Sequence, residues 1–297
     1  MLELSTVFVL GAGASVPYHF PTGFRLTEQV VAGLEQGHDG FNALQHMGGI
    51  HPEAILAFRE ALLQSGKNSV DAFLEHRTDL MEIGKLATAH RLISCERTSR
   101  LFTFDDSWLR ELYNRLNSSF ETFGNNRISF VTFNYDRSVE HFLFTALANT
   151  YGRSHHEVKA VLNNIPIVHL HGRLGALPWQ DGPSRPYEPS FDQQTLRTAA
   201  DSIKIIHEDI SDGRDADFAK AKDLLITADQ VIFMGFGYNA MNVERLGIRE
   251  LPENTAIGSC VGLGASGETA AKELTGGRVR LVGGDCTHFI REIMRWH

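Results

Sequence analysis

A glycine-rich turn near the start of the chain has residue types that can hold a phosphate group. The apolar, β-branched run at 7–10 predicts a buried strand, and it leads directly into Gly-Ala-Gly-Ala-Ser at residues 11–15. Glycines let the backbone turn sharply and approach a ligand closely, as in the pyrophosphate turns of dinucleotide-binding folds. Val16 and Pro17 stand where a third glycine is usual. An ordinary strand-to-helix turn therefore remains the alternative for this motif alone.

Chemically useful side chains also follow three later apolar runs, at residues 128–133, 165–170 and 230–234. Each run is continuous and apolar, which is typical of a strand buried on both faces of a parallel sheet. The residues that follow these runs are Asn134 and Asp136, then His171, then Gly235, Phe236 and Gly237. Because ligands of doubly wound sheets bind beyond the carboxyl ends of the strands, we expect these residues to meet the glycine-rich turn at one rim.

The elements that must position these residues alternate between strands and helices in the second half of the chain. Further strands are predicted at 256–263 and 279–282, with a short one at 202–206. Helices are predicted at 26–36, 51–65, 69–74, 81–93, 104–120, 138–150, 216–228, 241–246, 266–274 and 287–296. This alternation predicts an α/β fold, a Rossmann-like doubly wound parallel sheet.

The region 27–124 shows no convincing strand, so it predicts an α-helical insertion after the first strand. We expect one domain that spans residues 1–297. The charged residues of the insertion are interpreted as a solvated face. Residues 177–191 contain four prolines and few periodic apolar positions, and they predict a surface loop.

Composition and charge exclude several classes of function. The formal net charge of −8 argues against a general nucleic-acid or anionic-membrane surface. No apolar run approaches the ~20 residues of a membrane span, and no basic segment precedes the first apolar run, which argues against a secretory signal. The cysteines at 95, 260 and 286 suit a reducing compartment and are too few for a cysteine-rich zinc site. We therefore expect a cytoplasmic protein without a metal site.

As a set, the motifs resemble those of the sirtuin superfamily. The matching segments are 11–15, Pro21 with Phe24-Arg25, Thr-Phe-Asn-Tyr-Asp at 132–136, His171-Gly172, Gly-Phe-Gly at 235–237 and Gly-Asp-Cys at 284–286. Within the insertion, Val-Asp-Ala-Phe-Leu at 70–74 and Ile-Gly-Lys-Leu at 83–86 are similar to segments of bacterial sirtuin-like proteins of antiphage defence. The motifs span nearly the whole chain outside the insertion, and their specificity lies in the set rather than in any one of them.

The resemblance implies a site for NAD, which would be a substrate. The turn at 11–15 would hold the pyrophosphate, Arg25 would lie near a phosphate or the nicotinamide ribose, and Asp136 would address the nicotinamide end. Gly235 and Gly237 would line the adenosine ribose, and the backbone of Cys286 would contact adenine. The implied cofactor-binding residues are Gly11, Ala12, Gly13, Ala14, Ser15, Phe24, Arg25, Thr132, Asp136, Gly235, Phe236, Gly237, Asp285 and Cys286.

The resemblance also implies that Asn134 and His171 are the catalytic residues. An amide can donate and accept hydrogen bonds without adding charge, which suits Asn134 to positioning. An imidazole has an unperturbed pKa of about 6.5, which suits His171 to act as a general base on the ribose hydroxyls. Cleavage of the N-glycosidic bond builds positive character on the ribose, so a preorganised polar site would stabilise the transition state.

Two departures from the sirtuin deacylases shape the expected activity. Those enzymes carry a four-cysteine zinc module and a Gln before the catalytic Asn, whereas this chain lacks the cysteines and has Phe133. Both departures fit water as the acceptor. The resemblance thus implies an NAD glycohydrolase that releases nicotinamide and ADP-ribose, an antiphage-defence effector that depletes NAD when triggered. Such effectors are held inactive in homo-oligomers, and the trigger would act in trans, as a HerA-type ATPase or a phage protein.

Other interpretations stay open beside this one. An NAD-dependent protein deacylase would turn over only with an acylated peptide, and a non-catalytic module would bind NAD or ADP-ribose without releasing nicotinamide. Asn134 and Asp136 could cap the following helix, and His171 could be a structural histidine. On a regular strand His169 shares the face of His171, one step deeper, where we expect a buried and satisfied side chain. Cys286 is interpreted as a small apolar filler.

Overall fold

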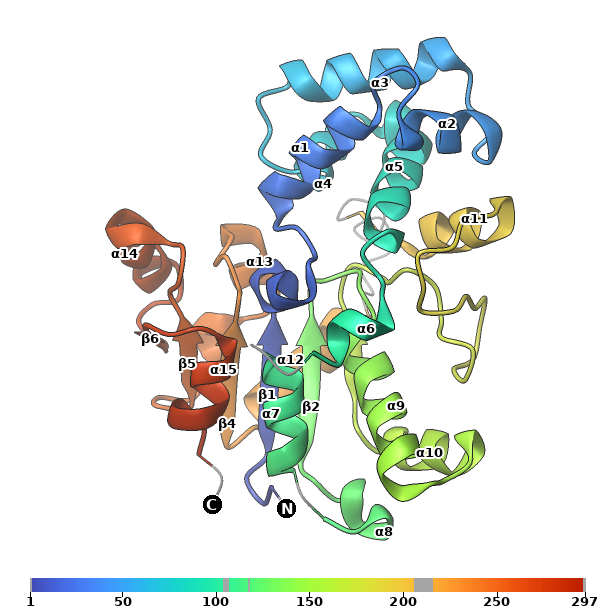
Figure 1. Cartoon of the computed structure of the whole chain (residues 1–297). Helices are drawn as coiled ribbons and strands as arrows, with labels where there is room; N and C mark the ends of the chain where they lie inside the picture. The colour runs from blue at the N-terminus through green and yellow to red at the C-terminus, as the bar shows by residue number, and fades with distance from the viewer. Residues whose placement is uncertain (1, 104–106, 117, 206–215, 296–297) are drawn as a thin grey trace.

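The centre of the molecule is a parallel sheet with the strand order β3-β2-β1-β4-β5-β6 (Figure 1). The protein is seen here in a computed structural model, which describes residues 2–103, 107–116, 118–205 and 216–295. The strands are β1 (Thr6–Leu10), β2 (Ile128–Thr132), β3 (Ile167–His169), β4 (Gln230–Met234), β5 (Ala256–Ser259) and β6 (Val279–Val282). The sheet winds outward in both directions from β1 and β4, so the predicted Rossmann-like doubly wound α/β fold is confirmed.

The central strands are buried because both of their faces carry apolar side chains. Every residue of β1 and β4 is buried. Phe8 of β1 lies in register with Phe130 of β2, and their rings stack 5.5 Å apart on one face. Val9 and Phe233, by contrast, belong to the apolar cluster on the opposite face. A strand of this kind is stable only when helices cover both sides of the sheet.

Helices supply that cover on each face. On the face of Phe8 lie α7 (Trp108–Arg115), α9 (Ser138–Tyr151) and, near the C-terminus, α15 (Cys286–His288) with the π-helix Phe289–Ile293. On the face of Val9 lie α12 (Ala216–Ile226), α13 (Ala240–Arg245) and α14 (Gly264–Leu274). The sheet is thus the middle of three layers.

A helical lobe lies above the carboxyl ends of the strands (Figure 1). It contains α1 (Gly23–Gly33), α2 (Asp39–His46), α3 (Pro52–Gln64), α4 (Val70–Leu74) and α5 (Met81–Ile93). It also contains α11 (Gln193–Ser202), which follows β3 in the chain and packs on α5. The rest of the predicted insertion returns to the sheet as α6 (Thr98–Leu101), α7 and α8 (Phe120–Phe123). The lobe and the insertion are therefore overlapping but different sets of residues.

Several local predictions differ from the structure. α2, α10 (His155–Leu162) and α11 were not predicted, although α10 and α11 begin with capping boxes, on Ser154 with Glu157 and on Asp192 with Thr195. The predicted helix 104–120 is two helices, α7 and α8, with residues 104–106 and 117 outside the described residues. The predicted helix 287–296 is α15 followed by the π-helix, and residue 296 lies outside the described residues. The predicted strand 202–206 is reduced to one bridge between Ile203 and Gly172, and residue 206 lies outside the described residues.

The solvated-face interpretation is wrong for Glu96, which is fully buried. Its carboxylate accepts hydrogen bonds from Nη2 of Arg137 at 2.6 Å and Nε of Arg137 at 2.9 Å, and from Nη1 of Arg185. Arg137 and Arg185 are also buried. Charges lose hydration when they are buried, so they are tolerated only when paired and hydrogen-bonded. This buried ion cluster of three residues joins the end of α5, the segment after β2 and the proline-rich loop.

The proline-rich segment 177–191 contains no helix or strand, as predicted, but it does not lie wholly at the surface. Leu177, Arg185 and Tyr187 are buried. Carbonyl groups of the loop also point inward, because those of Arg185 and Pro186 accept hydrogen bonds from the guanidinium of Arg137, each at 2.9 Å. The loop is therefore anchored by polar contacts that composition does not reveal.

The loops after β1 and β4 meet through their backbones, and only glycine fits at the contact. The N–H of Gly13 donates to the carbonyl of Gly235 at 3.0 Å. Gly235 has a φ of 58°, and a Cβ there would lie 2.1 Å from the backbone nitrogen of Ala14. A Cβ at Gly11 would lie 2.4 Å from the carbonyl oxygen of Gly235. This contact fixes the distance between the two central loops of the rim.

We predict that Gly235→Ala lowers the free energy of unfolding by at least about 2 kcal/mol, because it adds both a backbone clash and an unfavourable φ. Gly237→Ala is the matched control, since nothing lies within 4 Å of the Cβ it would add. Its effect should stay within about 1 kcal/mol. Urea denaturation followed by circular dichroism measures both variants. Equal effects would show that the close contact of the two loops does not determine stability.

Candidate functional site

The glycine-rich turn is held in place from the side of α7. It leads into a short helix, η1 (Ala12–Tyr18). The indole Nε1–H of Trp108 donates to the carbonyl of Ala14 at 2.8 Å. The hydroxyl of Tyr18 accepts the backbone N–H of Leu109 at 3.0 Å, and burial raises the pKa of this hydroxyl. The turn thus has a fixed position at the end of β1.

Much of the backbone of this turn is already hydrogen-bonded within the protein. The N–H groups of Gly11, Gly13 and Ala14 donate to the carbonyls of Met234, Gly235 and Gly11, respectively. In the described conformation they do not point freely at a ligand. Ala12 begins η1, and the first N–H groups of a helix lack partners within the helix. The predicted pyrophosphate contact therefore falls to Ala12, or it needs a rearranged turn.

The amide of Asn134 points at this turn, and its orientation is determined by its partners. Nδ2 donates to the carbonyl of Gly11 at 2.9 Å and to Oγ of Ser15 at 3.0 Å. A carbonyl only accepts, so nitrogen and not oxygen must face Gly11. Within the described part of the chain, no hydrogen bond engages Oδ1. Asn134 is therefore not a helix cap, and its acceptor oxygen is available to a ligand.

Asp136 continues the same polar chain. The hydroxyl of Ser15 donates to Oδ2 of Asp136 at 2.7 Å, and the N–H of Ser138 donates to Oδ1 at 3.1 Å. One carboxyl oxygen thus caps the start of α9, as the alternative interpretation expected, while the other reaches the glycine-rich turn. Burial raises the pKa of Asp136, and the hydrogen bonds from Ser138 and Ser15 partly offset this. The structure therefore brings Ser15, Asn134 and Asp136 together.

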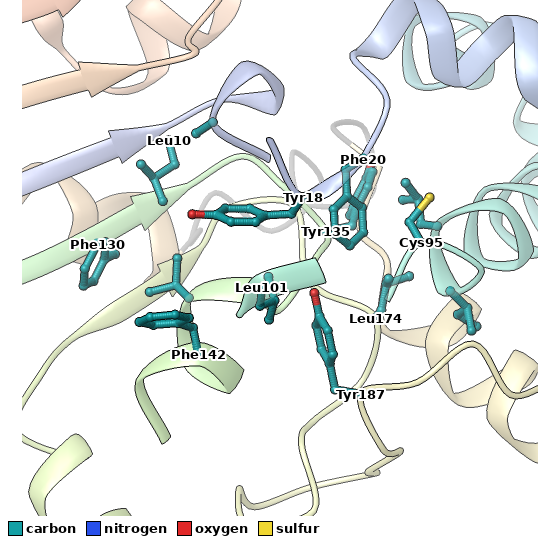
Figure 2. Packing of buried hydrophobic residues seen from close by; sticks show 14 of the residues in the cluster. Leu10, Tyr18, Phe20, Cys95, Leu101, Phe130, Tyr135, Phe142, Leu174 and Tyr187 are labelled. Atoms are coloured by element: carbon teal, nitrogen blue, oxygen red, sulfur yellow. The ribbon is translucent and has the colours of Figure 1, made fainter. Parts of the chain in front are cut away.

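A cavity of about 100 Å³ lies against these groups, between the rim and the helical lobe. Its lining residues include Ala12, Ser15, Phe20, Pro21, Gly23, Leu26, Asp71, Leu92, Phe133, Asn134, Tyr135 and Asp136. Figure 2 shows Phe20 and Tyr135 beside each other in the buried cluster that leads from Leu10 toward Cys95 of the lobe. The cavity therefore has one wall from the sheet and another from the lobe.

Asp71 and Tyr135 were missed as candidate site residues. The hydroxyl of Tyr135 donates to Oδ1 of Asp71 at 2.5 Å, and both residues line the cavity. Burial raises the pKa of Asp71, and the bond from Tyr135 partly offsets this. In the sequence, Asp71 followed the helix cap Ser69 and was interpreted only as part of a helix start. The signal available was its place in the segment at 70–74 that carries the family resemblance.

His171 lies deeper than the cavity, behind aromatic rings. Its ring is edge-on to Phe133, with centroids 5.4 Å apart, and 6.4 Å from the ring of Tyr135. Burial, and then repulsion from Arg245, lower the pKa of His171 to about 4. Its Nε2 atom is buried without a hydrogen-bond partner in the described structure. The imidazole is neutral at pH 7 and has an unused ring nitrogen, but it does not line the cavity.

Three other predicted residues lie around or outside this cavity. Thr132 is buried, and its hydroxyl accepts the N–H of Asn134 at 3.0 Å. Phe24 is 54% exposed, and neither Phe24 nor Arg25 lines the cavity. Arg25 is exposed on α1 and pairs with Glu28 at 2.7 Å. The structure thus gives Thr132 a positioning contact, and it places Phe24 and Arg25 apart from the polar chain.

The remaining predicted residues follow β4 and β6. Gly235 contacts the glycine-rich turn, and Phe236 packs against Phe133 with ring centroids 5.2 Å apart. Asp285 accepts the N–H of His288 and so caps α15. Cys286 is buried in the apolar core, and burial raises the pKa of its thiol to about 12, in agreement with a filler role. These residues therefore lie beyond the carboxyl ends of β4 and β6.

Comparisons with family models and with curated proteins find no match to this chain. In the described residues, no group of three or more His, Cys, Asp or Glu side chains is arranged to hold a metal ion. No described helix is both long and apolar enough to span a membrane.

We predict that the bond between Tyr135 and Asp71 ties the lobe to the rim. Tyr135→Phe leaves a buried carboxyl group without this donor, which should lower the free energy of unfolding by about 1–3 kcal/mol. Asp71→Ala, Tyr135→Phe and the double variant form a mutant cycle, measured by urea denaturation. A direct bond predicts that the double variant loses less stability than the sum of the single losses. Strictly additive losses would contradict the link.

Proposed function

We propose that the protein is an NAD glycohydrolase, which cleaves NAD to nicotinamide and ADP-ribose with water as the acceptor. The observation that carries the proposal is the oriented amide of Asn134. Its nitrogen donates hydrogen bonds to Gly11 and Ser15, its oxygen has no hydrogen bond within the described structure, and the residue lines a cavity at the end of the central strands. This is the rim at which doubly wound folds bind nucleotides. The family resemblance supplies the identity of the nucleotide.

The polar groups of the cavity suit a reaction that develops positive charge. As the bond to nicotinamide breaks, positive character builds on the ribose ring, and fixed oxygen dipoles stabilise it without reorganisation. Oδ1 of Asn134 is one such oxygen, held by two hydrogen bonds from its own amide nitrogen. The carboxyl group of Asp136, bonded to Ser15, lies next to it. Both would favour the transition state over the ground state.

The size of the cavity limits which part of NAD it can hold. Pockets that enclose a drug-sized ligand measure about 300–1,000 Å³, whereas this cavity measures about 100 Å³. It has room for one small ring rather than a dinucleotide. We assign it to the nicotinamide end, with the rest of the substrate along the rim toward Gly235 and β5.

His171 has a suitable protonation state for a general base. Because its pKa is lowered to about 4, the ring is neutral at pH 7, and a neutral imidazole has one nitrogen that can accept a proton. Phe133 both lines the cavity and packs against this imidazole. Contact between His171 and a ribose hydroxyl would therefore need the ring of Phe133 to move aside.

One observation favours a second candidate, a module that binds NAD or ADP-ribose without cleaving it. His171 does not line the cavity in the described conformation. A pure binding module predicts retention of ligand with no nicotinamide released.

By resemblance alone, the physiological role proposed for the enzyme is NAD depletion in antiphage defence, in a homo-oligomer triggered by a partner ATPase or a phage protein.

We predict that Asn134→Ala reduces nicotinamide release by about 100-fold or more, because it removes an oriented dipole from the transition state. The control is Asn149→Ala, which changes an exposed amide on α9 that bonds only its own helix. Release from NAD is measured by chromatography at high protein concentration. Wild-type activity in Asn134→Ala, or ligand retention without any release by the wild type, would overturn the proposal.

We also predict that kcat/KM of the enzyme falls with acid near pH 4, and not near the ordinary histidine value of 6.5. Activity is lost when His171 of the free enzyme becomes protonated, and the pKa of His171 is lowered to about 4.

The pKa values of His90 and His141 are likewise lowered to about 4 by burial. Their folded-state pKa values lie below the unfolded ones, so stability is lost as pH falls from about 6.5 toward 4.

Aliquots returned to pH 7 separate the two effects, because reversible loss reports titration and irreversible loss reports unfolding. An acid limb near pH 6.5 in protein that remains folded would show that His171 is not the base.

A further inference from the structure

A second histidine, two residues before His171, lies between two hydrogen-bond acceptors. His169 ends β3, and its side chain is 7% exposed. Nδ1 lies 3.0 Å from the carbonyl oxygen of Asn134, and Nε2 lies 2.7 Å from Oε1 of Glu140 on α9. The side chain of Glu140 is 2% exposed. The expectation that His169 is buried and satisfied is therefore confirmed, and its partners allow a further step.

Counting donors and acceptors limits the protonation state of this pair. A neutral imidazole has one donor and one acceptor nitrogen, whereas an imidazolium has two donors. The carbonyl of Asn134 can only accept, so Nδ1 must carry a proton. Nε2 then either donates to a Glu140 carboxylate or accepts from a protonated Glu140. The pair therefore holds one shared proton, and the question is which residue carries it.

The surrounding charges place that proton on His169. Nη1 of Arg173, which follows β3, lies 3.8 Å from the same Oε1 of Glu140. A second positive group near this oxygen favours the carboxylate. Burial alone would raise the pKa of Glu140, but His169 first, then a backbone hydrogen bond and then Arg173 lower it, so its pKa is lowered overall. Among the described residues, the charged groups around the imidazole are Glu140, with Arg173 and Asp136 near that carboxylate.

This contact completes the attachment of Asn134. Its N–H donates to Oγ1 of Thr132, and its carbonyl is the group that His169 holds. Both backbone polar groups of Asn134 are therefore fixed by neighbouring strands, since Thr132 and His169 are register partners of β2 and β3. With the backbone fixed, the amide reaches Gly11 and Ser15 without searching other orientations.

We propose that His169 is a positioning residue, held as an imidazolium by Glu140, that fixes the carbonyl of Asn134 and thereby aims its amide at the glycine-rich turn. The charge of His169 is balanced by Glu140, so the pair positions Asn134 without adding net charge to the site. His171, two residues on, is neutral. Only the effect on turnover rests on the proposed NAD glycohydrolase activity.

The protonation state is tested by nitrogen NMR of the full-length protein labelled with ¹⁵N-histidine. At pH 7 we expect both ring nitrogens of His169 to be protonated, with His171 as a neutral internal reference. His169→Gln and His171→Gln assign the signals. In Glu140→Gln, the carboxamide can donate to Nε2, so His169 should become neutral and keep its Nδ1 proton. A neutral His169 in the wild type at pH 7 would overturn the assignment of charge.

The positioning role is tested by the side-chain NH₂ signals of Asn134, assigned with Asn134→Ala. His169→Leu should shift these signals, because the carbonyl of Asn134 loses its donor, while Glu140→Gln, which keeps the donor, should shift them less. Unchanged signals in folded His169→Leu would overturn the role. If the wild type releases nicotinamide, His169→Leu should lower kcat at least 10-fold and Glu140→Gln much less. If it releases none, the proposed function fails, and the NMR results alone decide the role of His169.

Discussion

The buried carboxylate of Glu96 is the constraint on which the arrangement of the site depends. It lies with Arg137 and Arg185 at three fully buried positions, where a charge without partners would be strongly destabilising. Two guanidinium groups carry more N–H donors than one carboxylate can accept, so backbone carbonyls take most of the rest, and Nε of Arg185 is buried without a partner in the described structure. Those carbonyls come from residues 175, 176, 185, 186 and 188. The course of the proline-rich loop follows from this need.

The same cluster controls the position of the cavity. Arg137 directly follows Asp136, and Glu96 follows α5, the helix on which the lobe is built. The ion cluster therefore fixes the end of the lobe to the segment that carries Asn134 and Asp136. The hydrogen bond from Tyr135 to Asp71 is a second link between the lobe and this segment. A cavity with one wall on the sheet and another on the lobe needs both attachments to keep its shape.

The strand ends could be predicted from the sequence because continuous apolar runs report burial on both faces, as in β1 and β4. The rim followed from the parallel, doubly wound sheet that the alternation of strands and helices predicts, because ligands of such sheets bind beyond the carboxyl ends of the strands. The partners of the rim could not be predicted, since they come from distant parts of the chain. Glu96 has the same local pattern as a solvated glutamate, and Asp71 the pattern of a helix start. Their roles depend on tertiary contacts, which periodicity and capping rules cannot predict because they use only local sequence.

Glycine in the first turn serves two requirements that compete for the same backbone. Gly13 is needed so that its N–H can reach Gly235, and this leaves that N–H unavailable to a phosphate. Binding of a phosphate by this N–H would therefore require its hydrogen bond between the two central loops to break. Asn134, by contrast, is fixed at its N–H, its carbonyl and its amide nitrogen. Any motion that the proposed catalysis requires would therefore fall on the glycine contact and on the ring of Phe133 beside His171, since Asn134 is held at three points.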